Sequence, residues 1–454
     1  MYSMTRRQMA GLMGAVAIAP KLALAHEGTP AAATPAASPA VGKAVLKATY
    51  TFPEIPLATF QNELLPDHPI ADDRGFLLGG IGSDIFHVPG TADTLLYMVT
   101  DRGPNGTVKV GDESRTTFPV PDFTPTIFLV SLENEAIEVL DAIPLVGKSG
   151  APVTGLPNTD RLDAPAWDFS GEKQLPYNPS GLDTEGLVLA NDGSFWLADE
   201  YSPSLVHVRI DGTVVARYVP EGLELAGADY PVVGSLPAIY AERRSNRGFE
   251  GLAISGDGST LFAALQSPLY VPDKKAGQAS VNTRILAFST SAAKPSAEYV
   301  YQFDDVTAFD PAVEGATDEM KLSGIAWVNE TTLLVIERTD DVAKIYAIDL
   351  SGATNLLGGE ADDAGTSPSL EERNDLGGTA IVPVAKTLVV DLNEVATMPQ
   401  KIEGLAIIDD TTIAVANDND FDINEFDADG RTIPTGRASQ VFVIGLPAPL
   451  GLAE

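Results

Sequence analysis

Short apolar runs of strand length, separated by polar turns, recur along this chain. The runs LVLA, LAIS, IAWV and LAII each precede a polar turn, and the runs FWLA, LFAA, LLVI and IAVA follow those turns. Two such runs joined by a turn rich in Gly and Asp predict a β-hairpin. Further strand-like runs follow the hairpins, for example LVHVRI with VVARYV and RILAFST with EYVYQF. The pattern therefore predicts an all-β protein built from repeated four-stranded units.

Each hairpin opens on the same short signature. Three copies read Glu-Gly-Leu and one reads Ser-Gly-Ile, and they begin at Glu185, Glu250, Ser323 and Glu403. A looser first copy surrounds Asp84. Four-stranded units repeated along a chain are typical of β-propeller blades, which pack face to face around a central channel. We expect a propeller, with a solenoid of shorter repeats as the structural alternative.

Five blades can be recognised, and a sixth is possible if residues 146–180 or 219–245 hide a degenerate copy. The last hairpin is followed by a single clear strand, SQVFVIGL. The strand VLKATYTF at residues 45–52 would supply the missing outer strand of that blade. We therefore predict a ring of five or six four-stranded blades, closed by pairing of the N- and C-terminal strands.

The repeat also predicts a site. The innermost strand of a propeller blade lines the channel, so the residue that opens it is expected at the channel mouth. The second run of each hairpin ends on the same side as the first begins. Carboxylates that converge in this way repel one another unless they share protons or bind a cation. We therefore expect the polar residues at these run ends around the same mouth; they are Asp101, Asp199, Glu337 and Asn417.

Calcium is the cation that these ligands favour. Hard oxygen ligands, with no cysteine in the chain and only four histidines, suit calcium better than zinc or copper. The alternative is that each glutamate only accepts hydrogen bonds from backbone amides of the neighbouring blade. The predicted metal ligands are Glu185, Glu250, Glu403, Asp199, Asn417 and Asp101.

Several cationic residues stand beside these acids. Arg102 lies in the stretch DRGPNG, Arg247 precedes Phe249, and Arg338 follows Glu337. Arginines at a metal site grip the oxygens of a phosphate or carboxylate, although they also serve as simple ion-pair partners for acids. We take Arg102, Arg338 and Glu337 as the candidate catalytic residues.

Composition excludes several classes of function. The chain has 29 Lys and Arg residues against 63 Asp and Glu residues, a formal net charge of -34. Such a surface repels phosphate backbones and anionic lipid, so nucleic-acid binding is not expected. The absence of cysteine removes disulfides and thiol catalysis. No G-x-S-x-G, H-E-x-x-H or Walker sequence is present.

The N-terminus resembles an export signal. Arg6 and Arg7 precede the apolar run Met9–Pro20, and Ala23-Leu24-Ala25 fits a signal cleavage site. The paired arginines resemble a twin-arginine signal, and an ordinary secretory signal is the alternative. We predict a signal peptide at 1–25 and an Ala/Pro/Thr/Ser-rich disordered linker at 26–44.

The remainder, residues 45–454, is predicted to form one propeller domain. No apolar run in it is long enough to span a bilayer. The mature protein is thus expected in the periplasm, in the medium or at the cell surface, as a monomer.

The repeat motifs resemble those of the family called esterase-like activity of phytase, or phytase-like domain proteins. The resemblance spans nearly all of residues 46–447. It is carried by DRGPNG at 101–106, GLDTEG at 181–186, NRGFEG at 246–251, KIEGL at 401–405 and NDNDF at 417–421. It implies an exported, propeller-like protein that hydrolyses phosphoric or carboxylic esters. The acidic mouth is also similar to that of calcium-dependent propeller lactonases.

Two functions remain open. The first is an ester hydrolase in which calcium holds the substrate oxygen, with a small ester or phosphoester as substrate. A lactonase-type hydrolase is a variant of this function. The second is a non-catalytic propeller that binds a ligand or partner and uses calcium as a structural plug.

Overall fold

The computed structural model describes residues 43–313, 315–427 and 429–453. The predicted export signal, and all but the end of the predicted linker, lie outside these residues. Strands make up most of the regular structure, which confirms the all-β prediction. No helix in this part of the chain has the length and apolarity needed to cross a membrane.

The strands form four large sheets, connected mostly by antiparallel hairpins. The first sheet has eight strands in the order β2 (Asp84–His87), β3 (Leu95–Val99), β6 (Thr126–Glu133), β7 (Ala136–Pro144), β1 (Val45–Thr51), β25 (Gln440–Gly445), β22 (Thr412–Asn417) and β21 (Ile402–Asp409). The second has five strands, β8 (Thr184–Leu189), β9 (Phe195–Asp199), β10 (Ser204–Val208), β11 (Val214–Pro220) and β12 (Val232–Leu236).

The third and fourth large sheets have four strands each. The third contains β13 (Phe249–Ile254), β14 (Thr260–Leu265), β15 (Asn282–Ser289) and β16 (Lys294–Gln302). The fourth contains β17 (Lys321–Asn329), β18 (Thr332–Arg338), β19 (Ala343–Asp349) and β20 (Ala385–Asp391). Two small hairpins are formed by β4 (Gly106–Val110) with β5 (Glu113–Thr117) and by β23 (Ile423–Phe426) with β24 (Thr432–Pro434). The α-helices are α1 (Leu57–Leu64), α2 (Lys274–Ala279) and α3 (Val306–Phe309).

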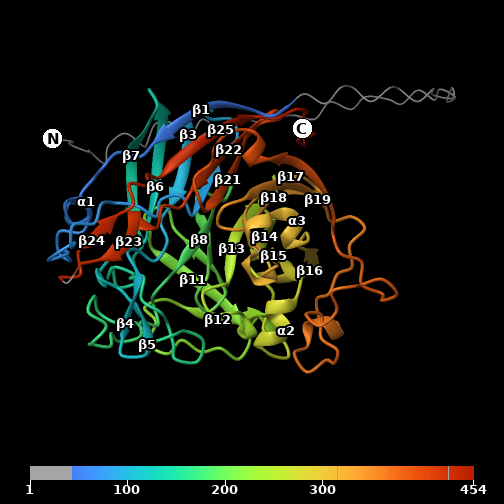
Figure 1. Ribbon diagram of the computed structural model, residues 1–454, viewed down its shortest axis with the longest axis horizontal. Coiled ribbons are helices and arrows are strands. Elements are labelled where there is room, and N and C mark those ends of the chain that lie inside the picture. Colours follow the sequence, from blue (N-terminus) through green and yellow to red (C-terminus); the bar gives the residue numbers. More distant parts are fainter. Residues whose placement is uncertain (1–42, 314, 428, 454) are drawn as a thin grey trace. The chain divides into compact units, whose positions relative to one another are not determined.

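The eight-stranded sheet consists of two four-stranded halves. They are joined at one parallel pair, Thr51 with Ala136. In the second half, β1 pairs antiparallel with β25 from Val45 to Thr51, so the first strand of the domain completes a sheet made from its last strands. The sequence predicts this pairing, and Figure 1 shows the blue β1 beside the red β25.

The first strands of successive sheets lie side by side in a closed series. β2 contacts β8, β8 contacts β13, β13 contacts β17, β17 contacts β21, and β21 returns to β2. Glycines allow this approach: a Cβ atom on Gly251 would lie 2.3 Å from the carbonyl oxygen of Ser323, and one on Gly324 would lie 2.4 Å from that of Glu403. The glycine of the repeated signature is thus required by backbone packing.

The apolar core follows the same series. Separate clusters of buried side chains join β3, β6 and β7 to β8–β11, β8–β10 to β13–β15, and β13–β16 to β17–β19. Two more clusters join β17–β20 to β21, β22 and β25, and the latter strands to β2, β3, β6 and β7. Each four-stranded unit therefore buries both of its faces against its neighbours, a propeller-like arrangement.

The two segments that were considered for an additional blade behave differently. Within the described chain, residues 146–180 form isolated bridges and no strand. Residues 219–245 contribute β12, which adds a parallel fifth strand to the second sheet beside β11.

Candidate metal centre

The repeated glutamates sit at β-bulges in the first strands. In β8, Thr184 pairs with Asp199 and Gly186 with Ala198, so Glu185 is an extra residue without a partner on β9. The register of β13 shifts in the same way around Glu250, and that of β21 around Glu403. A bulge re-aims the side chain of its extra residue. Here the three bulges direct three glutamates toward one point.

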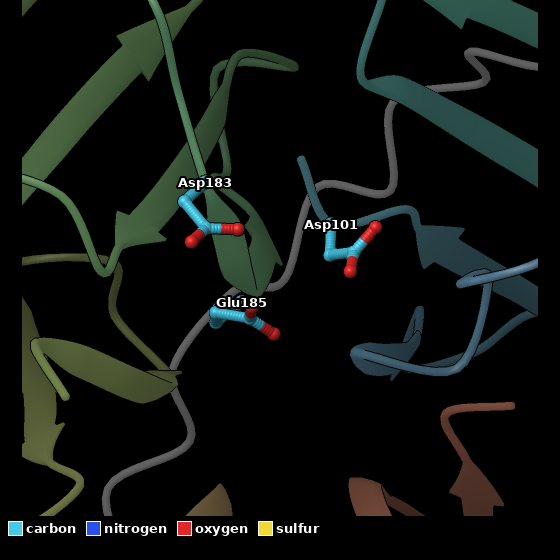
Figure 2. A group of neighbouring side chains, drawn as sticks. All are labelled: Asp101, Asp183 and Glu185. Atoms are coloured by element: carbon cyan, nitrogen blue, oxygen red, sulfur yellow. The ribbon is translucent and has the colours of Figure 1, made fainter. Parts of the chain in front are cut away.

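Their carboxylates belong to two overlapping groups. One oxygen each of Glu185, Glu250 and Glu403 lie within 4.8 Å of one another, and the same holds for Asp101, Asp183 and Glu185. Figure 2 shows the second group. Glu185 lies on β8, Asp183 immediately precedes that strand, and Asp101 belongs to the segment after β3. All five side chains are buried, and Glu185 is 9% exposed. We call these five residues the central cluster.

The cluster contains more negative charge than its arginines neutralise. Arg338 contacts Glu250 at 3.3 Å and also pairs with Glu403, while Arg102 contacts Asp183 at 3.1 Å. Within the described residues, the carboxylate of Glu185 has neither an ion-pair partner nor a hydrogen-bond donor. A buried carboxylate without a partner is costly unless a proton or a cation neutralises it.

The donor set fits a hard cation. The cluster offers only carboxylate oxygens, which is the ligand type that calcium prefers. In addition, Oε2 of Glu250 is buried without a hydrogen-bond partner. These residues therefore fit a calcium ion on the chemistry of their oxygens and on the oxygens left unpaired.

Burial shifts the titration of these acids. It raises the pKa of Glu185 well above its usual value, and the negative charges of Glu250 and Asp183 raise it further. Burial likewise raises the pKa of Glu403 to about 8, although the neighbouring Arg338 opposes the rise. The pKa of Asp101 is raised by burial and by the charge of Asp418. Without a cation, the cluster would hold protons near neutral pH.

The fourth sheet carries Ser323 in place of a glutamate. The register of β17 shifts between Leu322 and Ile325, as in the other first strands. Ser323 accepts a hydrogen bond from Nε of Arg338 at 2.7 Å and donates one to Glu250 at 3.2 Å. The serine thus makes room for a fully buried arginine where the other sheets supply an acid.

Asp199 does not join the cluster. Its carboxylate accepts hydrogen bonds from the backbone N–H of Asp183 at 2.8 Å and from the hydroxyl of Ser204 at 2.7 Å, and it pairs with the buried Arg217. These partners lie at the start of β8 and on β10 and β11 of the same sheet. Asp199 therefore supports the loop that carries Asp183. We expected its carboxylate at the channel mouth among the metal ligands, and the structure corrects this expectation.

Glu337 and Asn417 also point away from the cluster. Glu337 accepts hydrogen bonds from Lys386 and from the backbone N–H of Asp304, both at 2.7 Å. Asn417 accepts one from the backbone N–H of Gln440 at 2.8 Å. Each residue pairs with the first strand next to the register shift, and its hydrogen bonds hold the side chain against strands further from the centre, β20 and β25. The expectation that they face the channel is corrected as well.

The residues that follow Asp199 and Glu337, which are Glu200 and Arg338, lie closer to the cluster. The backbone N–H of Glu200 donates a hydrogen bond to the carbonyl oxygen of Asp183 at 2.9 Å, and Oε1 of Glu200 is buried without a hydrogen-bond partner. Burial and the charges of Glu250 and Asp183 raise the pKa of this carboxyl group well above its usual value. The sequence analysis assigned no role to Glu200 or Asp183. Asp183 stands two residues before Glu185, so simple strand alternation would put both side chains on one face. The bulge at Glu185 interrupts this alternation, and it cannot be recognised from the residue pattern.

Asp84 plays a different part from the glutamates. Its carboxylate accepts hydrogen bonds from the backbone N–H groups of Leu187 and Ile85, both at 2.9 Å, and from that of Leu405 at 3.4 Å. These amides belong to β8, β2 and β21. Asp84 therefore ties three first strands together, and this is the backbone role considered as the alternative for the glutamates.

Arg102 is held in place beside the central cluster. It donates hydrogen bonds to Asp183 at 3.1 Å and to Asn105 at 3.0 Å, and it also pairs with Asn246. The turn that carries it is braced by Asp101, which accepts a hydrogen bond from the backbone N–H of Gly103 at 2.8 Å. The DRGPNG stretch thus supplies both an acid and an arginine to the centre.

Comparison with known proteins yields one family match that covers most of the chain. The family model described as Phytase-like, esterase-like activity of phytase, matches residues 77–421. A protein called an uncharacterized secreted protein, from Arthroderma benhamiae, is 28% identical over 323 residues. This match covers 60% of the present chain and 61% of the fungal protein, so the chain spans about three fifths of that relative's length.

Solved structures with a loosely similar course of the chain include three proteins. PhoX of Pseudomonas fluorescens, in complex with vanadate, is 8% identical with a TM-score of 0.35, over 91% of this chain and 96% of that one. The aldose sugar dehydrogenase of Streptomyces coelicolor is 12% identical with a TM-score of 0.34, over 83% and 97%. The calcium-binding protein regucalcin from Agrobacterium tumefaciens is 11% identical with a TM-score of 0.34, over 83% and 93%.

Proposed function

The chain belongs to the Phytase-like family, and on this premise we propose that it is an exported, calcium-dependent hydrolase of phosphoric or carboxylic esters. The observation that carries the proposal is Glu185, a buried carboxylate with no partner among the described residues, at the meeting point of four other carboxylates. The substrate is a small ester or phosphoester held at this point.

The scaffold in this proposal is a propeller of five blades. The eight-stranded sheet counts as two blades, because a single parallel pair joins its halves. The closed series of first strands and the five core clusters between neighbouring units support this count. The ring closes within a blade made from β1 and the last strands of the chain.

Calcium is held, in this proposal, by the central cluster. The ligands are Glu185, Glu250, Glu403 and Asp101 from the sequence analysis, with Asp183 added by the structure. Bound calcium supplies Lewis acidity, which polarises a substrate oxygen and stabilises developing negative charge. Ligand carboxylates must be ionised to bind the metal, so binding releases protons that the raised pKa values would otherwise retain.

Protein groups around the cluster have separate tasks. Arg102, fixed by Asp183 and Asn105, orients the substrate from the rim of the cluster. Arg338 is a positioning residue, because its guanidinium is taken up by Glu250, Glu403 and Ser323. Glu337, Asp199 and Asn417 support the sheets around the site and have no catalytic or ligand role in this proposal.

Export is proposed from two observations. The N-terminal arginines and the cleavage-like Ala23-Leu24-Ala25 fit a twin-arginine signal, and the fungal relative is named as a secreted protein. Fractionation of cells that produce the full chain should recover a shortened protein outside the cytoplasm. A variant with Arg6 and Arg7 both replaced by Lys should stay inside, whereas an ordinary secretory signal would tolerate that change.

The central experiment combines metal analysis with activity. Purified protein should contain calcium, and it should hydrolyse at least one of phytate, p-nitrophenyl phosphate, p-nitrophenyl acetate or a lactone. EDTA should abolish the activity and calcium should restore it. Protein that carries no metal and turns over none of these substrates would overturn the proposal.

One observation favours a second candidate function, a non-catalytic propeller stabilised by calcium. Arg338 links β13, β17 and β21 through Glu250, Ser323 and Glu403, which is a structural use of the centre. The variant Glu250→Gln separates the two functions. If the centre is catalytic, activity falls by orders of magnitude. If it is a plug, only thermal stability falls and there is no activity to lose.

A further inference from the structure

Three arginines lie in or next to the motifs that build the centre, and they differ in how many of their donors are used. Arg338 donates to Ser323, Glu250 and Glu403, and Arg102 to Asp183, Asn105 and Asn246. Arg247 donates a single hydrogen bond among the described residues, from Nη1 to the hydroxyl of Ser267 at 3.0 Å, and it makes no ion pair there. A guanidinium carries five N–H donors. Most of the donors of Arg247 are therefore free.

The backbone beside Arg247 is fixed against the site. Gly248 packs on the second sheet so closely that a Cβ atom there would lie 2.2 Å from the carbonyl oxygen of Glu200. The residue after Gly248, Phe249, begins β13, which leads into the bulge at Glu250. Ser267, the hydrogen-bond partner of Arg247, follows β14, the strand that pairs with β13. Arg247 thus lies next to the central cluster without being paired to it.

Other cations gather on the same side. Lys321 and Arg338 share Asp340 as an ion-pair partner, and Arg244 contacts Asp318 at 3.5 Å. Burial lowers the pKa of Lys321 to about 8, and the nearby positive charges of Arg338 and Arg247 contribute to this shift. Each of these three cations has an acidic partner, whereas Arg247 makes no ion pair among the described residues. The charge of Arg247 is therefore the one available to a negatively charged group beside a bound cation.

We propose that Arg247 is the residue that binds an oxyanion group of the substrate, a phosphoryl or carboxylate group, beside the metal held by the central cluster. The planar fork of a guanidinium matches two oxygens of such a group. This inference rests on the proposed function, because the anion is held next to that function's calcium ion. It replaces the sequence-based choice of Arg338, whose donors are already used.

The arrangement also couples the binding of the anion to the binding of calcium. The central cluster has three more carboxylates than it has arginines paired to it. An anion approaching Arg247 is repelled by this excess until a divalent cation neutralises it. Calcium and the oxyanion therefore bind cooperatively, each strengthening the affinity of the other.

The test is equilibrium binding of orthophosphate, and separately of acetate, to the calcium-loaded protein by titration calorimetry. The variant Arg247→Gln should weaken binding of the preferred anion by about ten- to a hundredfold, the range expected for a charged hydrogen bond. The variant Arg247→Lys should weaken it less, because it keeps the charge and loses the fork. The control is Arg209→Gln, since Arg209 is 65% exposed and pairs with Asp211 at a turn; this variant should bind like the wild type.

The two anions identify the group that is bound. Binding of orthophosphate alone indicates a phosphoryl group, and binding of acetate alone indicates a carboxylate. Failure of both to bind the wild-type protein overturns the inference, as does wild-type affinity in both Arg247 variants. These binding measurements do not depend on hydrolysis of a substrate. A protein that holds calcium and orthophosphate through Arg247 but hydrolyses no ester would overturn the proposed hydrolase function and leave the anion site standing.

Discussion

Two groups of buried acids in this protein are neutralised in different ways. In the outer cluster, which consists of Arg284, Glu298 and Glu371, one guanidinium contacts Glu298 at 2.6 Å and Glu371 at 2.8 Å. One oxygen of each carboxylate lacks a hydrogen-bond partner, yet both acids share a charge partner. In the central cluster, Glu185 has none among the described residues. An acid of the outer cluster is buried with its cation, whereas Glu185 needs a proton or a bound cation to neutralise it.

The outer cluster has a clear structural task. Arg284 lies on β15 and Glu298 on β16, while Glu371 belongs to the long connection between β19 and β20. Nη1 of Arg284 also donates a hydrogen bond to the carbonyl oxygen of Ala361 in that connection at 3.0 Å. Leucines of the same connection pack on Val300 of β16. The ion pairs thus fasten a long loop to the third sheet.

The largest expected effect is on stability, from the variant Arg284→Met. Removing the guanidinium leaves two buried carboxylates without their cation, which should lower the free energy of unfolding by about 3–5 kcal/mol. Calcium binding should be unchanged. Urea unfolding of the calcium-loaded protein measures the loss, with Arg209→Met as the exposed control. A loss no larger than that of the control would mean that the outer cluster does not stabilise the fold.

The reciprocal variant is Glu185→Gln in the central cluster. It should weaken calcium binding by about a hundredfold or more, because the loss of a ligand should exceed the loss caused by removing a residue that only supports a ligand. Hydrolysis should fall together with calcium binding. In EDTA, the variant should be at least as stable as the wild type, because an amide is neutral without the proton that the buried carboxylate has to take up. Calcium titration and thermal unfolding measure the two effects.

The matched control for Glu185→Gln is Glu371→Gln in the outer cluster. It should keep the calcium affinity of the wild type and lose stability. If both variants change calcium affinity alike, the distinction between the two clusters is wrong.

A smaller effect is expected from pH on the calcium-free protein. Burial raises the pKa of Glu403 from 4.5 to about 8 and that of Asp418 to about 6, so the folded state binds more protons than the unfolded chain. The free energy of unfolding should therefore fall as pH rises from 4.5 to 8, by about 1.4 kcal/mol per pH unit for each proton retained only in the folded state.

Calcium should remove this fall, because the metal binds the ionised carboxylates. Chemical unfolding at a series of pH values, in EDTA and in calcium, measures both curves. A calcium-free protein whose stability rises steadily over this range would contradict the raised pKa values.

The smallest effect concerns Asp84, an acid satisfied by backbone amides. In the variant Asp84→Asn, the NH₂ group of the new amide faces a backbone N–H group that now donates a hydrogen bond to the carboxylate. Two donors then face each other, which should lower the free energy of unfolding by about 1–2 kcal/mol. Calcium affinity should not change, since Asp84 binds the amides of Leu187, Ile85 and Leu405. Loss of calcium binding in this variant would add Asp84 to the metal ligands.

Much of the fold could be predicted from the residue pattern, because blade hairpins are local. The alternation of apolar runs and turns predicts the strands, and the single strand after the last hairpin predicts the pairing of β1 with β25. The family resemblance is confirmed by the match over residues 77–421. For the site, the recurring glutamates identify Glu185, Glu250 and Glu403 as residues that converge.

The remaining site residues depend on side-chain direction, which the pattern does not contain. Asp199 is the last residue of β9 and Glu337 the last but one of β18, but their carboxylates bind partners further from the centre. Glu200 and Arg338, one residue later, lie closer to the central cluster. The reason is that β8 and β17 contain bulges and their partners β9 and β18 do not, so a common alternation does not apply to both strands of a hairpin.

By itself, the sequence determined that this protein is all-β, that it repeats, and which acids recur at matched positions, because these depend on neighbours along the chain. Only the tertiary structure decided which acids keep a cation of their own. Arg338 reaches Glu403 and Arg284 reaches Glu371 across 65 and 87 positions of the chain, respectively. Ion pairs between such distant residues exist only once the sheets have closed around the centre, and they leave Glu185 without a partner.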